Sequence, residues 1–245
     1  MRIISTVPSI TELLYDLGLS DEVVGITKFC VHPTQWYKTK ERIGGTKSLN
    51  IAKIKELSPT HIICNKEENV EDQIEQLRAC SSIHLTDIKS PEDNLELITA
   101  LGILTNKRMT AIRLRSQLEA ALKKLQNKTE QSALYLIWKD PYMTIGVDTY
   151  IHAVMEKIGL TNIISETRYP QITLEQIRSL EPEVILLSSE PYPFKEQHRL
   201  EFSELFPSTK VYLVDGEAFS WYGTRLIKKA SYLKELLGNN TGKSL

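Results

Sequence analysis

Short apolar runs alternate with amphipathic segments along this chain, which is the pattern of strands alternating with helices. Residues 2–7 are strand-like, and apolar residues then recur at helical spacing at Ile10, Leu13, Leu14 and Leu17. We expect this helix to start with a capping box at Ser9 and Glu12 and to end at Gly18. The alternation continues with expected strands over 23–26, 60–64 and 82–85, and expected helices over 49–57, 71–79 and 94–101. This order predicts an α/β fold with a mostly parallel sheet.

A long helical run without Gly or Pro occupies residues 105–126. At 1.5 Å per residue it would extend over ~33 Å, about the diameter of a small domain. Such a helix could connect two lobes, and the alternative is an ordinary surface helix of one domain. Strands are then expected over 133–138, 184–188 and 210–214, with helices over 150–158 (capped by Asp148 and closed by Gly159), 174–180 and 226–237.

Two segments of the chain resemble each other without a gap. Residues 51–63 align with residues 174–186, and the pairs are Ile51/Leu174, Ile54/Ile177, Leu57/Leu180, Pro59/Pro182, Ile62/Ile185 and Ile63/Leu186. Each copy reads as a helix with an apolar stripe, a Pro that stops it, and a buried strand. Coincidence is the alternative, because Pro often separates a helix from a strand. A duplication predicts two similar α/β lobes, and we place them at 1–104 and 128–245, with a linker helix over 105–127.

Composition is that of an ordinary globular protein and narrows the choice of partners. The chain has 30 basic and 31 acidic residues without a strongly basic cluster, so no nucleic-acid partner is expected. No run of 18 apolar residues is present, so no membrane span is expected. The three cysteines form no CxxC pair, and Cys64 in an apolar run is expected to be a small buried residue. We expect a monomer.

The start of the sequence leaves two locations open. Met1 and Arg2 lead directly into the first expected strand, and no apolar signal segment precedes it. The chain is therefore either a cytoplasmic protein with a native start at Met1, or a periplasmic or extracytoplasmic protein whose signal segment has been removed.

Common catalytic motifs are absent from the sequence. It contains no GxGxxG, P-loop or GxSxG motif, and its five histidines lack the HExxH spacing. We therefore expect a protein that is not an enzyme and has no catalytic cofactor. The expected lobes point instead to ligand binding, because ligands bind outside the carboxyl ends of parallel strands and at lobe interfaces.

Several short motifs occur in an order that resembles one known family. They are the opening RIISxxPSxTE at residues 2–12, Gly44-Gly45 before Leu49-Asn50-Ile51, LxPxxI at 57–62, Asn162-Ile163-Ile164, and residues 219–225. Over nearly the whole chain they resemble the helical-backbone substrate-binding proteins of ABC importers, and most of all the cobalamin-binding ones, with siderophore-binding relatives. The resemblance implies two Rossmann-like lobes joined by a stiff helix, ligand capture in a cleft between them with little hinge motion, and no catalysis.

Candidate ligand-binding residues follow the expected strands of each lobe. Pro8 and Ser9 begin a helix whose free N–H groups attract polar groups, and the aromatic residues would supply flat apolar surface for a macrocycle. Trp221 and Tyr222 are adjacent, so we expect at least one of them to face a ligand rather than the core. Arg225 would pair with a ligand carboxylate or cap the local fold. The candidates are Pro8, Ser9, Phe29, His32, Asn65, Lys66, Trp138, Tyr142, Tyr192, Phe194, Trp221, Tyr222 and Arg225.

Two of these positions depart from the cobalamin-binding pattern, and they shape the expected ligand. The cobalamin-binding proteins that this sequence resembles look like they have an aromatic residue at the position of His32 and a Trp at the position of Asn65. His32 would contact the ligand edge or ligate its cobalt. Cobalamin or another corrinoid is the leading candidate, and a ferric siderophore is an alternative. A cytoplasmic corrinoid or tetrapyrrole carrier without an importer, and an interaction protein with an empty cleft, stay open as well.

The resemblance also implies a permease partner. In the family, an acidic residue on each lobe docks onto basic residues of the permease. The candidates are Glu67, Glu68 and Glu71 in the first half and Glu190, Glu196 and Glu201 in the second.

Overall fold

The computed structural model of the chain describes residues 1–125 and 130–236, and these divide into two compact units. Of the described residues, the first unit comprises 1–88, 92–119 and 221–227, and the second comprises 89–91, 120–125, 130–220 and 228–236. A short segment near the C-terminus therefore belongs to the first unit. The boundaries expected from the sequence, at 104/105 and 127/128, stay a prediction, and residues 126–127 of the expected linker lie outside the described residues.

The first unit is built on a five-stranded parallel sheet with the strand order β3-β2-β1-β6-β7. Gly44–Gly45 and Ser48–Leu49 form a small antiparallel ladder beside it. Its elements are β1 (Ile3–Ser5), α1 (Pro8–Asp16), β2 (Val23–Ile26), α2 (Thr34–Thr39), β3 (Glu41–Arg42), β4 (Gly44–Gly45), β5 (Ser48–Leu49), α3 (Ile51–Glu56), β6 (His61–Asn65), α4 (Glu71–Glu75), β7 (Ser82–Thr86) and α5 (Pro91–Leu104).

The second unit repeats this topology with the strand order β10-β8-β11-β12, and β9 pairs antiparallel with β8. Its elements are β8 (Gln131–Trp138), β9 (Met143–Thr144), α7 (Tyr150–Lys157), β10 (Leu160–Asn162), α8 (Leu174–Leu180), β11 (Val184–Ser188), α9 (Glu196–Leu205), β12 (Lys210–Val214) and α10 (Gly216–Ser220). Two helices contain residues of both units. They are α6 (Arg108–Leu125) and α11 (Arg225–Glu235). The expected α/β class with two mostly parallel sheets is confirmed.

The duplication seen in the sequence is also present in the backbone. Ser58 and Glu181, which occupy equivalent places in the two copies, both have a left-handed φ of 46° just before the Pro that precedes a strand. Gly18 and Gly159 close the equivalent helices α1 and α7 with φ values of 79° and 82°. The same backbone conformations at equivalent positions support an internal duplication of one α/β unit.

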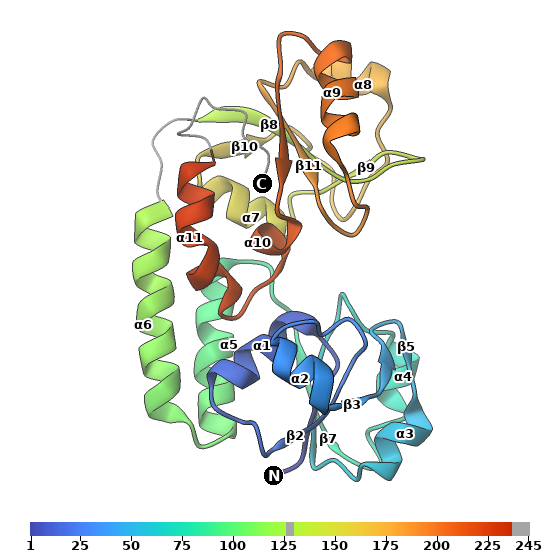
Figure 1. The fold of residues 1–245 in the computed structure, drawn as a ribbon, viewed down its shortest axis with the longest axis vertical. Helices are drawn as coiled ribbons and strands as arrows, with labels where there is room; N and C mark the ends of the chain where they lie inside the picture. Colours follow the sequence, from blue (N-terminus) through green and yellow to red (C-terminus); the bar gives the residue numbers. More distant parts are fainter. Residues whose placement is uncertain (126–129, 237–245) are drawn as a thin grey trace. The chain divides into compact units, whose positions relative to one another are not determined.

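Each sheet is covered on both faces, and its helices pack through apolar stripes; the helix α9 was not predicted from the sequence. In the first unit, Ile54 of α3 and Ile74 of α4 pack against Ile62 and Cys64 of β6. In the second, Ile177 of α8 and Phe202 of α9 pack against the alternating Leu and Ile residues of β8 and β11. Figure 1 shows α1 and α5 on the other face of the first sheet, and α7 and α10 on the other face of the second.

Several helix ends differ from the sequence expectations. Ser9 does not cap α1: the helix begins at Pro8, Val7 is its N-cap, and no side chain caps it. Thr149 rather than Asp148 caps α7, since the Asp148 carboxylate accepts a hydrogen bond from the Arg168 N–H at 2.6 Å.

The expected helices also differ in length. The helix α6 starts at Arg108 rather than at residue 105, because Asn106 has a left-handed φ of 57° and turns the chain after α5. The helix α4 ends at Glu75, four residues earlier than expected, and residue 237 of the expected last helix lies outside the described residues.

Two histidines on neighbouring strands of the first sheet are in direct contact. The Nδ1 atom of His61 lies 2.9 Å from the Nε2 atom of His84, and the ring centroids are 5.1 Å apart. One nitrogen must donate and the other accept, so this contact requires at least one neutral ring. Burial, followed by the nearby His61, lowers the pKa of His84 below its ordinary value.

This histidine pair predicts a loss of stability in mild acid. A lowered pKa means that the folded protein binds a proton at His84 more weakly than the unfolded chain does, so the free energy of unfolding falls as the pH drops through and below about 6.5. His84→Gln should lack this part of the dependence. Urea unfolding of both proteins between pH 8 and about pH 5 measures how the free energy of unfolding depends on pH. The same pH dependence in the two proteins would contradict the prediction.

Candidate functional site

The residues at the carboxyl ends of the parallel strands gather at one edge of each sheet. In the first unit the segments after these ends include the loops 6–7, 27–33 and 66–70, and in the second they include the loops 139–142 and 189–195. Open α/β sheets bind ligands at this edge because the loops and helix N-termini meet there. We call the group of loops in the first unit the first edge and the group in the second unit the second edge.

Three of the candidate residues present their side chains to solvent at the first edge. Phe29 is half exposed, and the ammonium group of Lys28 lies 5.1 Å from the centre of its ring. His32 is partly buried, and Lys66 is exposed and forms an ion pair with Asp87 at 3.1 Å. Pro8 and Ser9, in the first turn of α1, are buried. The accessible surface of this edge therefore includes one aromatic ring, one imidazole and two lysines, together with the exposed Val31.

Asn65 organises the loop that follows β6. Its side-chain oxygen accepts hydrogen bonds from the N–H groups of Glu67 and Glu68, at 2.8 and 3.3 Å, and its amide nitrogen donates to the Thr86 hydroxyl at 3.2 Å. Only 3% of Asn65 is exposed. This bonding fixes the shape of the loop, and a direct contact of Asn65 with a ligand stays a prediction.

The segment 221–225 contributes a buried aromatic pair to the first unit. Trp221 and Tyr222 are 8% and 4% exposed, so neither ring is presented to solvent, and the expectation that one of them faces a ligand stays a prediction. The segment is not a strand, so its consecutive side chains need not alternate between opposite faces and can both point inward. Burial raises the pKa of Tyr222 well above its ordinary value.

Arg225 forms a buried ion pair rather than an exposed contact. Its Nε atom lies 3.0 Å from a carboxylate oxygen of Glu12, and both side chains are less than 10% exposed. Its guanidinium carbon lies 4.9 Å from the centre of the Trp221 ring. The Trp221 ring in turn meets the His32 ring in a T-shaped contact, with centroids 5.6 Å apart. Of the two roles expected for Arg225, the structure therefore shows the local one.

The second edge carries a group of connected aromatic rings. Trp138, at the end of β8, is 39% exposed and meets the Tyr192 ring edge-on at 5.8 Å. Tyr192 also contacts Phe194 and His198, at 4.8 and 5.6 Å. Phe194 is only 5% exposed and belongs to the core of the second unit, so its ring is not part of the accessible flat surface that the sequence predicted.

The other ring partners fix this aromatic surface in place. Tyr142 meets the buried Phe202 edge-on at 5.4 Å. The Nδ1 atom of His198 accepts a hydrogen bond from the Lys195 N–H at 2.9 Å. Burial, then nearby Lys139, lowers the pKa of His198, which favours the neutral ring that this bond requires. The second edge therefore offers Trp138 and Tyr192 as a supported apolar surface.

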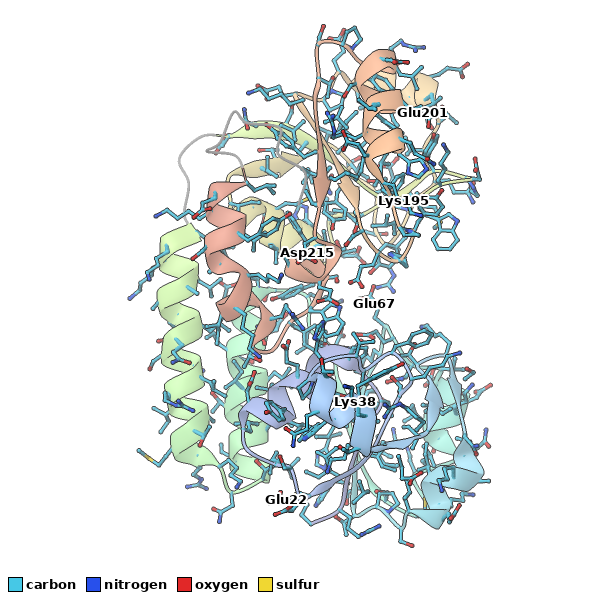
Figure 2. The ribbon with its side chains drawn as sticks, viewed as in Figure 1. Glu22, Lys38, Glu67, Lys195, Glu201 and Asp215 are labelled. Atoms are coloured by element: carbon cyan, nitrogen blue, oxygen red, sulfur yellow. The ribbon has the colours of Figure 1, made fainter. Side chains whose placement is uncertain are left out.

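The candidate docking acids lie on both units and differ in their surroundings. Figure 2 shows Glu67 in the loop after β6 and Glu201 on α9. Glu71 is exposed in the first turn of α4, and Glu68 is partly buried in the loop before it.

The three candidate acids of the second unit have polar partners within that unit. Glu196 pairs with Arg199, and Glu201 pairs with Lys139 at 2.9 Å. Glu190 accepts a hydrogen bond from Ser220 at 2.7 Å.

Among residues 1–125 and 130–236, no three or more His, Cys, Asp and Glu side chains form a group that could hold a metal ion. Within the same ranges, every helix is too short or too polar to cross a membrane.

A family model described as periplasmic binding protein matches residues 3–206, which is most of the chain. The chain belongs to this family. Its sequence is 28% identical to an uncharacterized ABC transporter substrate-binding lipoprotein, YvrC, of Bacillus subtilis, over 99% of this chain and 81% of that protein. It is 27% identical to a vitamin B12-binding protein of Vibrio campbellii, over 76% of this chain and 70% of that protein.

A solved structure agrees with the fold of this periplasmic binding protein. The periplasmic vitamin B12-binding protein BtuF of Vibrio cholerae superposes with a TM-score of 0.83 at 22% identity, over 97% of this chain and 96% of that one. The expected family and two-lobed fold are therefore confirmed. The similar proteins are binding proteins of transporters rather than enzymes.

Three residues that support the candidate site of this periplasmic binding protein could not be recognised from the sequence pattern. Glu12 read as part of a capping box, and nothing local indicated a partner more than two hundred residues away. Asn94 of α5, fully buried, exchanges two hydrogen bonds with the Gly223 backbone, at 2.7 and 3.0 Å. His198 carried a weak signal, since it follows the aromatic loop 192–194 by one helical turn.

Proposed function

We propose that this periplasmic binding protein captures a metal-chelate ligand, with cobalamin or another corrinoid as the leading candidate, for an ABC importer. The observation that supports it most is the set of accessible aromatic rings at the carboxyl edges, namely Phe29, Trp138 and Tyr192. Flat apolar surface binds the face of a macrocycle, whereas a bare metal ion needs converging carboxylates and imidazoles. The vitamin B12-binding relative in Vibrio campbellii supports the same ligand class.

His32 is the proposed contact to the metal or edge of the chelate. It is partly exposed at the first edge, and its T-shaped packing on Trp221 holds the ring in a defined orientation. A neutral imidazole can occupy an axial position of cobalt or iron if one of its nitrogens is accessible. We propose no catalytic step, so the chelate is cargo and not a cofactor.

Titration of the purified protein tests the proposal. Cyanocobalamin, haem and a ferric siderophore are added separately, and binding is followed by absorbance and calorimetry. We expect saturable one-to-one binding of at least one chelate, with cyanocobalamin the tightest. Binding of haem or of the siderophore alone would favour the alternative ligands, and no binding of any of the three would refute the proposal.

Substitution of His32 separates ligation from mere contact. If the imidazole ligates the metal, the change in the absorbance spectrum of the bound chelate should disappear in His32→Ala. If it only touches the ligand edge, the spectral change should persist while affinity falls. His61→Ala is the matched control, because this histidine begins β6 and so lies at the amino end of that strand, away from the carboxyl edges.

We further propose that acidic residues on each unit dock the protein onto an ABC permease outside the cytoplasmic membrane. Glu71 and Glu201 are exposed on helices that follow strands of their sheets, where a carboxylate can reach basic residues of a partner. Charged pairs at the rim of an interface guide association more than they add affinity. The lipoprotein relative in Bacillus subtilis supports this location.

Charge reversal of both docking acids should separate uptake from capture. We expect Glu71→Lys combined with Glu201→Lys to lower uptake by the importer roughly tenfold or more, because like charges in an interface repel. Affinity for the chelate should stay within about twofold of wild type, since surface charge changes of this kind act mainly on association with the partner. Uptake assays in vesicles carrying the permease measure the first quantity and calorimetry the second. Undiminished uptake would exclude these two residues from docking.

A further inference from the structure

The first unit contains a chain of contacts that begins at a buried carboxylate and ends at His32. Glu12 of α1 pairs with Arg225, Arg225 lies against the Trp221 ring, and Trp221 meets His32 edge-on. Glu12, Arg225 and Trp221 are each less than 10% exposed, whereas His32 is partly exposed. The contacts thus lead from the interior of the unit to its candidate ligand surface.

The segment that carries Arg225 and Trp221 is fixed to the first unit at several points. The Thr224 hydroxyl donates a hydrogen bond to Asp16, one helical turn after Glu12 on α1. The Asn94 amide binds both the N–H and the carbonyl group of Gly223. A Cβ atom at Gly223 would come within 3.0 Å of the Ser9 carbonyl oxygen, so the backbone lies directly against α1. Trp221 and Arg225 therefore have little freedom to adopt other positions.

Stability alone is a poor explanation for a charged pair in this place. Removing two charges from water is costly, and apolar residues of similar volume can stabilise a core as well or better. The pair does, however, hold the Arg225 guanidinium in place, because its Nε atom lies 3.0 Å from the buried Glu12 carboxylate and opposite charges attract strongly away from water. The planar guanidinium group then provides a flat surface for the indole ring of Trp221.

We propose that Glu12 is a positioning residue for ligand capture: through Arg225 and Trp221 it fixes the orientation of the His32 ring at the first edge. This inference rests on the proposed function, in which His32 contacts the chelate. Residues that contact a ligating side chain and fix its orientation alter the affinity for the ligand without touching the ligand themselves. Glu12 holds Arg225, and Arg225 and Trp221 transmit that constraint to the imidazole.

Glu12→Gln is the first test, because it keeps the shape of the side chain and removes its charge. We expect the His32 Hε1 resonance of the ligand-free protein to move toward its value in an unfolded peptide, since the ring loses its fixed place beside the indole. We also expect the affinity for cyanocobalamin to fall roughly 10- to 100-fold, the usual effect of losing an outer-shell partner. An unmoved His32 resonance in the folded variant would overturn the proposal.

Arg225→Lys separates positioning from plain charge neutralisation. Lysine restores a cation beside Glu12 but lacks the planar group that lies against Trp221. The proposal predicts that His32 moves in this variant as well, although the protein keeps a paired charge. A His32 resonance at its wild-type position would show that the pair only stabilises the fold. This variant also decides the matter if Glu12→Gln does not fold.

Lys229→Gln is the matched control. It removes a different ion pair, with Asp215 at 2.8 Å, one helical turn later on α11. Neither the His32 resonance nor the affinity should change in this variant, and a change in either would overturn the specific role of Glu12. If the wild-type protein binds no chelate, the proposed function fails, while the resonance of ligand-free His32 still tests the positioning role.

Discussion

Replacing Arg225 by Met is expected to lower the free energy of unfolding by about 3–5 kcal/mol, the usual effect of leaving a buried charge without its partner. The Glu12 carboxylate is 4% exposed, so water cannot easily take the place of the guanidinium group. The loss should appear in urea unfolding followed by tryptophan fluorescence, because Trp221 lies against Arg225.

The double variant Glu12→Leu/Arg225→Met is the control for this interpretation. It removes both charges and replaces them with apolar groups of similar size, which is often neutral or stabilising. Its stability should return to within about 1 kcal/mol of wild type, the range of a volume-conserving core exchange. A double variant as unstable as the single one would show that the shape of the segment, and not the unpaired charge, causes the loss.

Replacing Trp138 by Ala is expected to weaken chelate binding by about 2–4 kcal/mol, or roughly 30- to 1,000-fold, the range of a buried aromatic anchor. Trp138 ends β8 and is supported by Tyr192, so it offers a rigid apolar surface before any ligand arrives. Calorimetric titration with the tightest-binding chelate measures the loss.

The stability of the Trp138→Ala variant should change little, because the ring is well exposed in the ligand-free protein. Trp138→Phe should recover part of the affinity, since a smaller ring keeps some of the flat surface. Leu200→Ala is the matched control: this half-exposed apolar residue lies on α9 of the same unit. Equal losses from Leu200→Ala and Trp138→Ala would contradict a specific aromatic wall.

The regular elements of the fold could be predicted because their signals are local. The helix α8 and the strands β11 and β12 have the bounds that the pattern gave, and the repeat gave two similar units. Short elements such as β4, β5 and α10 were not predicted, because two to five residues do not establish a period. The ten-residue helix α9 was missed as well, because the segment after β11 was interpreted as a binding loop. The cap of α1 was misassigned because Ser9 and Glu12 match a capping box, while tertiary contacts use Glu12 elsewhere.

The candidate site could be predicted only in outline. The strand–loop alternation placed Phe29, His32, Trp138 and Tyr192 at carboxyl ends of parallel strands, and the structure has them there. It could not show which side chains are accessible, because burial of Asn65, Trp221 and Phe194 depends on residues distant in the sequence. The contribution of 221–227 to the first unit likewise follows from tertiary contacts with α1 and α5.

Hydrogen–deuterium exchange with and without saturating cyanocobalamin tests the central claim most directly, namely that the carboxyl edges of the two sheets bind the chelate. The account predicts slower exchange in the loops 27–33, 66–70, 139–142 and 189–195, which follow β2, β6, β8 and β11. The loops at the amino ends of the strands should exchange as before. Protection confined to those amino-end loops, or no protection anywhere under saturating ligand, would contradict the account.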